Sequence, residues 1–322
     1  MLAVRSVKSR ICSFITLISN MVYLPLASFP RRRESRPLKA GFRPTRGRRC
    51  VYCSIVVEYP PMCQLLGMNS NNPSDIRFSF AGLMQRGGNT DTHADGWGIA
   101  FYEGKACRLF LEPIASAQSK MAEFIRAYPI KSQIIISHIR RATQGSVCLE
   151  NTHPFSRELW GRQWTFAHNG HLKNFRSLAL ASDRYTPIGS TDSEYAFCWL
   201  LESILQAFAA PPDNITDLWQ FIYQRCCDIS QLGPFNILLS DSKYLYAFAS
   251  TRLSSITRRA PFGQAHLKDC DMAIDFKQTN HENDVITVVA TEPLTGDENW
   301  EKFADCELKI LQHGIVVGSY LA

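Results

Sequence analysis

The pattern of hydrophobic and polar positions predicts a chain dominated by strands, with two long helices between its strand-rich halves. Short apolar runs rich in β-branched and aromatic residues are typical of buried strands, whereas apolar residues three and four positions apart are typical of helices. We expect strands at 62–68, 99–104, 134–140, 164–170, 236–241, 244–250 and 284–291. We expect helices over residues 119–128, 193–209 and 217–229.

Turn-forming residues separate these segments. Residues 86–98, RGGNTDTHADGWG, are rich in glycine and aspartate and are expected to form a loop. The run at 164–170 ends in His-Asn-Gly, which predicts a turn because asparagine and glycine tolerate positive φ. Ser190, Thr191 or Asp192 can cap the helix over 193–209, because each offers a side-chain oxygen to the first free N–H groups.

The net charge of +6 is distributed unevenly along the 322 residues. Residues 1–61 contain twelve Lys or Arg and only two Glu, so this segment carries +10 and the remainder carries −4. A nucleic-acid-binding protein would need its basic residues on the folded body. The charge pattern therefore argues against a nucleic-acid partner.

The basic segment has the character of a leader rather than of a folded domain. Residues 11–29 are mostly apolar and follow basic residues, as in a signal peptide or a short membrane segment broken by Asn20 and Pro25. The following twenty residues show neither helical nor strand periodicity. If residues 1–61 do have a function, they would act as an export signal or as a basic arm. We expect 1–61 to be a disordered or non-native extension, through a misplaced start or a removed leader, and 62–322 to be one domain.

The cysteines do not indicate a disulfide framework, and no nucleotide-binding glycine loop indicates a cofactor. The eleven cysteines show no tight, even spacing, so free thiols in a reducing, cytoplasmic compartment are expected. Cys50 and Cys53 form a C-x-x-C, but no second pair follows at zinc-finger spacing. We predict no metal, no cofactor, and no membrane attachment in the mature form.

Five short motifs gain meaning from their order. Each is ambiguous alone, since Asp192 could be only a helix cap and Arg140 only a surface residue. Along the chain they are Met62-Cys63, HIRRATQG at 138–145, NTHPF at 151–155, HNG at 168–170 and STDSE at 190–194. In this order they resemble the class II glutamine amidotransferase domain, an N-terminal-nucleophile hydrolase. DGWGIAFYEG at 95–104 and VATEPLT at 289–295 resemble its single-domain YafJ-type members.

The resemblance implies a fold and a nucleophile. The fold is α+β, a four-layer α-β-β-α sandwich. The nucleophile is Cys63 as the first residue of the active chain. A thiol attacks as thiolate, and a free α-amine with a pKa of about 7.7–8.0 can take its proton. This mechanism requires that no peptide bond precede Cys63, and Met62 offers an internal start.

The resemblance also assigns the remaining catalytic and binding roles. Asn169 and Gly170 would donate hydrogen bonds to the oxyanion of the tetrahedral intermediate. Arg140 would bind the substrate α-carboxylate, for which a guanidinium is well shaped. Asp192 would hold the α-ammonium group.

The pocket walls are assigned less directly. Thr143 and His153 fall in matching motifs and are expected to line the pocket. Arg141 stands where other branches of the family carry an aromatic residue, so one wall of the pocket differs here. The DGWG stretch at 95–98 is either a pocket loop or a tight turn with a packed tryptophan.

The implied activity is hydrolysis of the glutamine side-chain amide to glutamate and ammonia through a cysteine thioester. Residues 63–322 are only enough for the hydrolase domain, so an ammonia acceptor would lie on a synthase partner protein. One alternative is a γ-glutamyl amide hydrolase acting on a peptide or modified-thiol substrate. Another is a secreted or membrane-attached binding protein in which Cys63 is blocked.

Overall fold

The computed structural model describes residues 63–321. The expectations for residues 1–61, and for Met62 as a start, therefore lie outside the described residues. No helix within 63–321 is long and apolar enough to cross a membrane.

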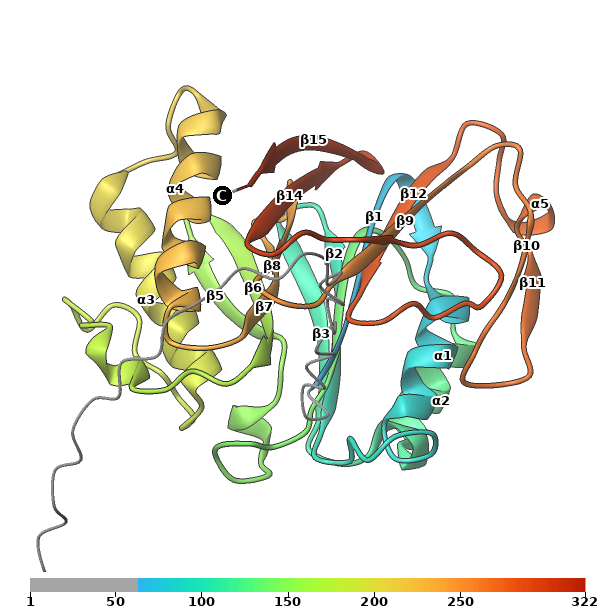
Figure 1. Cartoon of the computed structure of the whole chain (residues 1–322), viewed down its shortest axis with the longest axis horizontal. Helices are drawn as coiled ribbons and strands as arrows, with labels where there is room; N and C mark the ends of the chain where they lie inside the picture. The colour runs from blue at the N-terminus through green and yellow to red at the C-terminus, as the bar shows by residue number, and fades with distance from the viewer. Residues whose placement is uncertain (1–62, 322) are drawn as a thin grey trace, which may run out of the picture. The chain divides into compact units, whose positions relative to one another are not determined.

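Two antiparallel sheets form the centre of the described region (Figure 1). The seven-stranded sheet contains β1 (Gln64–Asp75), β2 (Trp97–Glu103), β3 (Ala106–Glu112), β4 (Lys131–Ile139), β9 (Ser254–Arg259), β12 (Val285–Ala290) and β13 (Glu301–Lys302). Its order is β13-β9-β12-β1-β4-β2-β3. The six-stranded sheet contains β5 (Phe155–Leu159), β6 (Arg162–Gly170), β7 (Phe235–Ser240), β8 (Leu245–Ala249), β14 (Glu307–Gln312) and β15 (Ile315–Tyr320). Its order is β15-β14-β8-β7-β6-β5.

Helices cover the outer face of each sheet (Figure 1). The helices are α1 (Arg77–Arg86), α2 (Lys120–Ala127), α3 (Asp192–Ala207), α4 (Ile215–Ser230) and the short α5 (Phe276–Thr279). Single 3₁₀ turns occur at Ser116–Gln118, Leu149–Asn151 and Phe175–Ser177, and β10 (Gln264–His266) pairs with β11 (Ala273–Asp275) in a separate ribbon. α1 and α2 pack on the seven-stranded sheet, and α3 and α4 on the six-stranded one.

The apolar pattern explains the four layers. In β1, Leu65 belongs to the cluster between the two sheets, whereas Leu66 and Met68 belong to the cluster beneath α1. A strand buried on both faces is apolar at successive positions rather than at alternate ones. The expected α+β, α-β-β-α sandwich is confirmed.

A hydrogen-bonded tyrosine joins the two sheets. The Tyr102 hydroxyl lies within 3.0 Å of the carbonyl oxygens of Gln163 and Ser240 and 2.8 Å from the Thr165 hydroxyl. Burial raises the pKa of Tyr102 strongly. A buried hydroxyl needs such partners, because an unpaired one costs about 1–3 kcal/mol.

Several boundaries differ from the sequence-based expectations. Residues 77–86 form α1, which the sequence did not predict, because this helix is buried along most of its surface and shows little polar–apolar alternation. His168, Asn169 and Gly170 do not form a turn, since all three pair with β7 and end strand β6. Their polarity reflects a buried site rather than a chain reversal.

Candidate active site

Cys63 lies directly before β1, with only 8% of its surface exposed. Its Sγ accepts a hydrogen bond from the Arg141 N–H at 3.2 Å and lies 3.3 Å from the Arg141 carbonyl oxygen. Burial raises the pKa of the Cys63 thiol to about 11, although the Arg141 N–H and the Arg140 charge act in the opposite direction. At neutral pH this thiol is therefore almost entirely protonated.

Two buried, oppositely charged side chains act on the thiol. Arg140 lies at the end of β4 and Asp192 begins α3, and each is 2–3% exposed. The Arg140 charge lowers the pKa of Cys63 and the Asp192 charge raises it. The fold thus brings three sequence-predicted residues into one electrostatic environment.

The Arg140 guanidinium also holds the loop that follows it. Its terminal nitrogens donate to the carbonyl oxygens of Gln144 at 3.0 Å, Gly145 at 3.3 Å and Ser146 at 2.9 Å. Thr143, carried by this loop, is exposed. Three of the five guanidinium N–H donors are therefore used by the loop, and two are left for another acceptor.

The DGWG stretch supports Arg140 from behind. The Asp95 N–H donates to the Arg140 carbonyl, the Arg140 N–H donates to the Gly96 carbonyl at 2.7 Å, and the Asp95 carboxylate accepts from the Ala142 N–H at 2.8 Å. Trp97 is fully buried against Phe80. The stretch is therefore both a support for the site loop and the start of a packed strand.

Asp192 is not the cap of α3. Thr191 is the cap, since its hydroxyl accepts from the Glu194 N–H at 3.1 Å. The Asp192 carboxylate instead accepts from the Leu172 N–H at 2.7 Å and the Ser193 N–H at 3.0 Å. It is thereby fixed to the segment just beyond His168–Gly170.

Asn169 is joined to β1, the strand that follows Cys63, through Thr291. The Asn169 Nδ2 donates to the Thr291 Oγ1 at 3.1 Å, and the same Oγ1 accepts from the Leu65 N–H at 2.9 Å. The Thr291 N–H donates to the Leu65 carbonyl at 3.1 Å. The Asn169 Oδ1 is buried and has no partner among the described residues. Thr291 therefore sets the position of Asn169 relative to the start of β1.

Only glycine fits at position 170, because there is no room for a Cβ. A Cβ at this position would lie 1.8 Å from the Pro234 carbonyl oxygen and 2.6 Å from the His168 Nε2. Any other residue would push β6 away from the segment that leads into β7.

Comparison with known proteins shows the family of this chain. The family model of the class II glutamine amidotransferases matches residues 62–321. This chain belongs to that family. It is therefore an enzyme with the N-terminal-nucleophile hydrolase fold.

Relatives of this amidotransferase span most of its length. It is 53% identical over 249 residues to "Putative glutamine amidotransferase YafJ" of Escherichia coli K12, covering 77% of this chain and 97% of that protein. A "Putative glutamine amidotransferase" of Haemophilus influenzae is 45% identical over 254 residues, covering 79% and 85%. The crystal structure of a "predicted glutamine amidotransferase" from Pseudomonas aeruginosa PA01 has a TM-score of 0.64 and 46% identity, covering 80% and all of that chain.

A more distant structure shares the fold. The glutamine phosphoribosylpyrophosphate amidotransferase of Bacillus subtilis has a TM-score of 0.51 at 16% identity. The match covers 80% of this chain and 49% of that protein. At this identity the likeness concerns the fold only.

Three buried histidines surround the amidotransferase site. The rings of His138 and His153 lie 4.2 Å apart, and their four nitrogens have no hydrogen-bond partner among the described residues. Burial, and then neighbouring histidines and Arg140, hold the pKa of both well below the usual range. Burial also lowers the pKa of His168, whose Nδ1 lies 2.8 Å from the Ser193 hydroxyl. His153 is thus a neutral, deeply buried side chain, unlike the exposed Thr143.

Sequence reasoning missed two residues that shape the site. Thr291 lay in the VATEPLT segment, which was noticed only as part of a resemblance. Arg86, 6% exposed, donates to the side chain of Gln64 and to the carbonyls of Glu292 and Pro293. It could not be found because α1 itself was not predicted. A buried arginine at a helix end becomes informative only once the helix is known.

We predict that acid destabilises this protein through the three histidines. Their pKa is lowered in the folded state, so below pH 6.5 the unfolded chain binds more protons and the free energy of unfolding falls as the pH falls. Each histidine contributes up to about 1.4 kcal/mol per pH unit, or roughly 4 kcal/mol for the three. Urea unfolding between pH 7.5 and 5.5 measures this slope.

The variant His153→Phe should reduce this slope by about a third, because it removes one titrating group while keeping an aromatic ring. His281→Gln is the matched control at an exposed histidine. An unchanged slope in His153→Phe would show that His153 is protonated in the fold and that the prediction is wrong.

Proposed function

We propose that this enzyme hydrolyses the side-chain amide of glutamine, giving glutamate and ammonia, with Cys63 as nucleophile. The observation that carries the proposal is the buried pair of opposite charges beside the thiol. Arg140 and Asp192 both act on Cys63 and do not bond to each other, since Arg140 donates to loop carbonyls and Asp192 accepts from backbone N–H groups and lies 3.8 Å from the His171 Nδ1. Such a pair suits a substrate that carries one carboxylate and one ammonium group at a fixed separation.

In the proposed reaction the Cys63 sulfur attacks the amide carbon of glutamine. A C–S bond forms, and the thiol proton passes to the α-amine of Cys63 and then to the departing nitrogen as the C–N bond breaks. Water hydrolyses the resulting thioester and releases glutamate. With a pKa of about 11, only about one thiol in ten thousand is ionised at pH 7, so a base within the site is needed.

The proposed active form begins at Cys63. A peptide bond between Met62 and Cys63 would turn the α-amine into an amide, which cannot accept the proton. Residues 1–61 would then be absent, as their separate charge pattern favours, and the domain of 62–322 would lose its initiating Met62. A cytoplasmic location remains a prediction that goes with this proposal.

The oxyanion donors are proposed to be the Asn169 side chain and the Gly170 N–H. Thr291 supports this role, because a hydroxyl that accepts from Leu65 still has one proton to donate. If the side-chain amide of Asn169 is flipped about its Cβ–Cγ bond, its Oδ1 accepts from the Thr291 hydroxyl. Its Nδ2 then lies where the unpartnered Oδ1 lay before. An N–H donor would then face the site in place of a buried, unpaired acceptor.

The substrate's ends are proposed to bind the two charged residues. The two guanidinium N–H groups that the loop leaves unused on Arg140 would bind the α-carboxylate. Asp192 would hold the α-ammonium. Thr143 and His153 are proposed as pocket walls, at the exposed rim and at the buried base respectively. Transfer of ammonia to an acceptor would require a synthase partner protein.

A second substrate class, γ-glutamyl amides with a larger amine portion, is favoured by a neighbouring cavity. This cavity of about 660 Å³ is lined by Gln64 and Thr291, which adjoin Cys63 and Asn169 respectively. Lys268 and Lys302 also line it, and neither forms an ion pair within residues 63–321. The cavity could accommodate an anionic amine portion of a γ-glutamyl peptide.

The identity of Cys63 as nucleophile is tested by substitution in protein whose first residue is position 63. Cys63→Ala should abolish release of glutamate from glutamine while leaving thermal unfolding unchanged. Cys63→Ser should also be strongly impaired, because a hydroxyl ionises far less readily than a thiol. Near-normal activity in Cys63→Ala would refute the assignment.

Protein purified from its native host tests the start of the active form. N-terminal sequencing is expected to begin at Cys63. A mature chain that begins upstream, combined with full activity, would exclude the self-amine mechanism. The same chain without activity would favour the alternative of a binding protein with a blocked cysteine.

Thr291 is expected to act as a positioning residue for Asn169. Thr291→Val removes the hydroxyl that holds the Asn169 side chain and accepts from the Leu65 N–H, and should lower kcat about tenfold or more with little change in KM. Thr291→Ser keeps the hydroxyl and should retain most of the activity. A Thr291→Val enzyme whose loss appears only in KM, or equal losses in both variants, would contradict this role.

The two substrate classes are separated by comparing kcat/KM for glutamine and for γ-glutamylglycine. We expect glutamine to be hydrolysed, and Lys302→Glu to leave that rate unchanged while lowering the rate for the dipeptide. Lys105→Glu, at an exposed turn, is the charge-matched control. If the dipeptide is hydrolysed and glutamine is not, the first substrate choice is wrong.

A further inference from the structure

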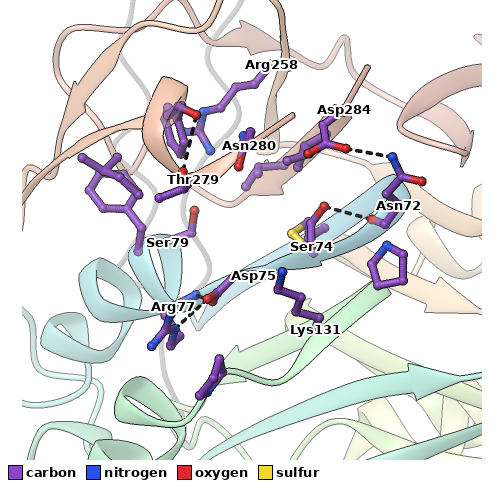
Figure 2. Close-up of a pocket in the computed structure, with 18 of the residues that line it drawn as sticks. Asn72, Ser74, Asp75, Arg77, Ser79, Lys131, Arg258, Thr279, Asn280 and Asp284 are labelled. Carbon is purple, nitrogen blue, oxygen red and sulfur yellow. Dashed lines mark hydrogen bonds and ion pairs between the residues drawn. The ribbon is translucent and has the colours of Figure 1, made fainter. Parts of the chain in front are cut away.

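A second large cavity lies at the far end of β1 from Cys63. It has a volume of about 700 Å³, and its β1 residues are Met68 and residues 72–75, whereas Cys63 directly precedes this strand at Gln64. Figure 2 shows its walls, which come from the end of β1, the start of α1 and the segment around α5. A cavity of this size matches those that hold small organic ligands.

The floor of this cavity is apolar and belongs to the core beneath α1. Its buried residues continue the cluster that packs the seven-stranded sheet against its helices. They are Met68, Phe78, Phe276, Ile286 and Val288. The core is therefore open to a ligand here. An apolar group that entered would stabilise binding, because burial of apolar surface contributes about 25 cal/mol per Å².

An unused hydrogen-bond donor faces this floor. The Asn280 Nδ2 is shielded from solvent and has no acceptor within the described part of the chain. The Ser79 hydroxyl, on a residue 5% exposed, lies in the same lining. Both line the cavity and are labelled in Figure 2. A buried donor of this kind favours a ligand that supplies an oxygen.

Two charged side chains of the lining are already bonded. Asp284 accepts from the Asn72 side chain and the His281 N–H, both at 2.8 Å. Arg258 is held by Glu298 through two hydrogen bonds and lies over the Phe276 ring. Asp284 and Arg258 are therefore engaged within the protein, and Asn280 keeps a buried donor without a partner.

The mouth of the cavity is positively charged. Arg126 and Lys131 are exposed and form no ion pair within residues 63–321, while Arg77 is paired with Asp75 at 2.7 Å. Lysine and arginine outnumber aspartate four to two among the residues that line this cavity. Unpaired cations above an apolar floor attract a ligand with an anionic head.

We propose that this cavity binds a small organic anion with an apolar body, such as a medium-chain carboxylate. The apolar body lies on the floor formed by the core residues. The carboxylate accepts from Asn280 and faces Lys131 and Arg126. This site is distinct from the Cys63 centre, and its existence does not depend on the reaction proposed there.

Decanoate is the probe for this site, with decan-1-ol as the uncharged comparison. Isothermal titration of the full chain should show one decanoate bound per chain, with decan-1-ol at least tenfold weaker. Lys131→Glu should weaken decanoate at least fivefold, and the control Lys105→Glu should not. Equal binding of acid and alcohol, or no binding, would overturn the proposal.

Two further variants test the cavity itself. Met272→Trp fills it from its partly exposed rim and should weaken decanoate at least tenfold. Asn280→Ala should weaken decanoate at least threefold without lowering the melting temperature, because it removes a donor that is unpaired in the free protein. If Met272→Trp fails to fold, Lys131→Glu and Asn280→Ala carry the test. Decanoate binding unchanged in both would place the anion elsewhere, for example on the basic residues 1–61.

Discussion

The position of β1 is the constraint on which the site depends. This strand pairs with β12 on one side and β4 on the other, and its side chains alternate between two buried layers. A one-residue slip would exchange the faces of Leu65 and Leu66 and move Gln64 into the inter-sheet core. Cys63, one residue before β1, is therefore held by the packing of the whole sandwich and not by a loop.

The charged groups around Cys63 are held by other parts of the protein and do not neutralise each other. Arg140 bonds to loop carbonyls, Asp192 bonds to backbone N–H groups, and the nearby histidines stay uncharged because burial lowers their pKa. The site therefore keeps one positive and one negative charge in a region from which water is largely excluded. Charges in such a region act strongly on a ligand, since little solvent screens them.

The fold class, which the family resemblance implied, is confirmed, and the site residues that the same resemblance indicated remain a prediction. Apolar runs marked the central strands, and polar motifs at strand ends marked the residues that converge on Cys63. The same signals failed at His168–Gly170, where a turn-like motif is paired strand, and at α1, whose burial leaves little alternation to detect. Edge strands such as β15, largely exposed, carry a similarly weak pattern.

Contacts between distant segments could not be predicted from one sequence. Thr291 lies 226 residues from Leu65 and 122 from Asn169, yet it bonds to both. The unexpected role of the Arg140 guanidinium in holding residues 144–146 likewise requires the folded loop. Residue types therefore indicated which chemistry was possible, and only the packing of two sheets revealed which residues position it.

Burial favours the electrostatic binding of the proposed substrate and opposes the formation of the Cys63 thiolate. It strengthens the fields of Arg140 and Asp192, but it also raises the pKa of Cys63 to about 11, which makes a standing thiolate rare. A neutral α-amine on the same residue resolves this conflict, because it can take the proton as the sulfur attacks. When that amine is protonated, its charge favours the thiolate. A peptide bond at this nitrogen supplies neither effect, so the proposed chemistry depends on the bond between Met62 and Cys63 being absent.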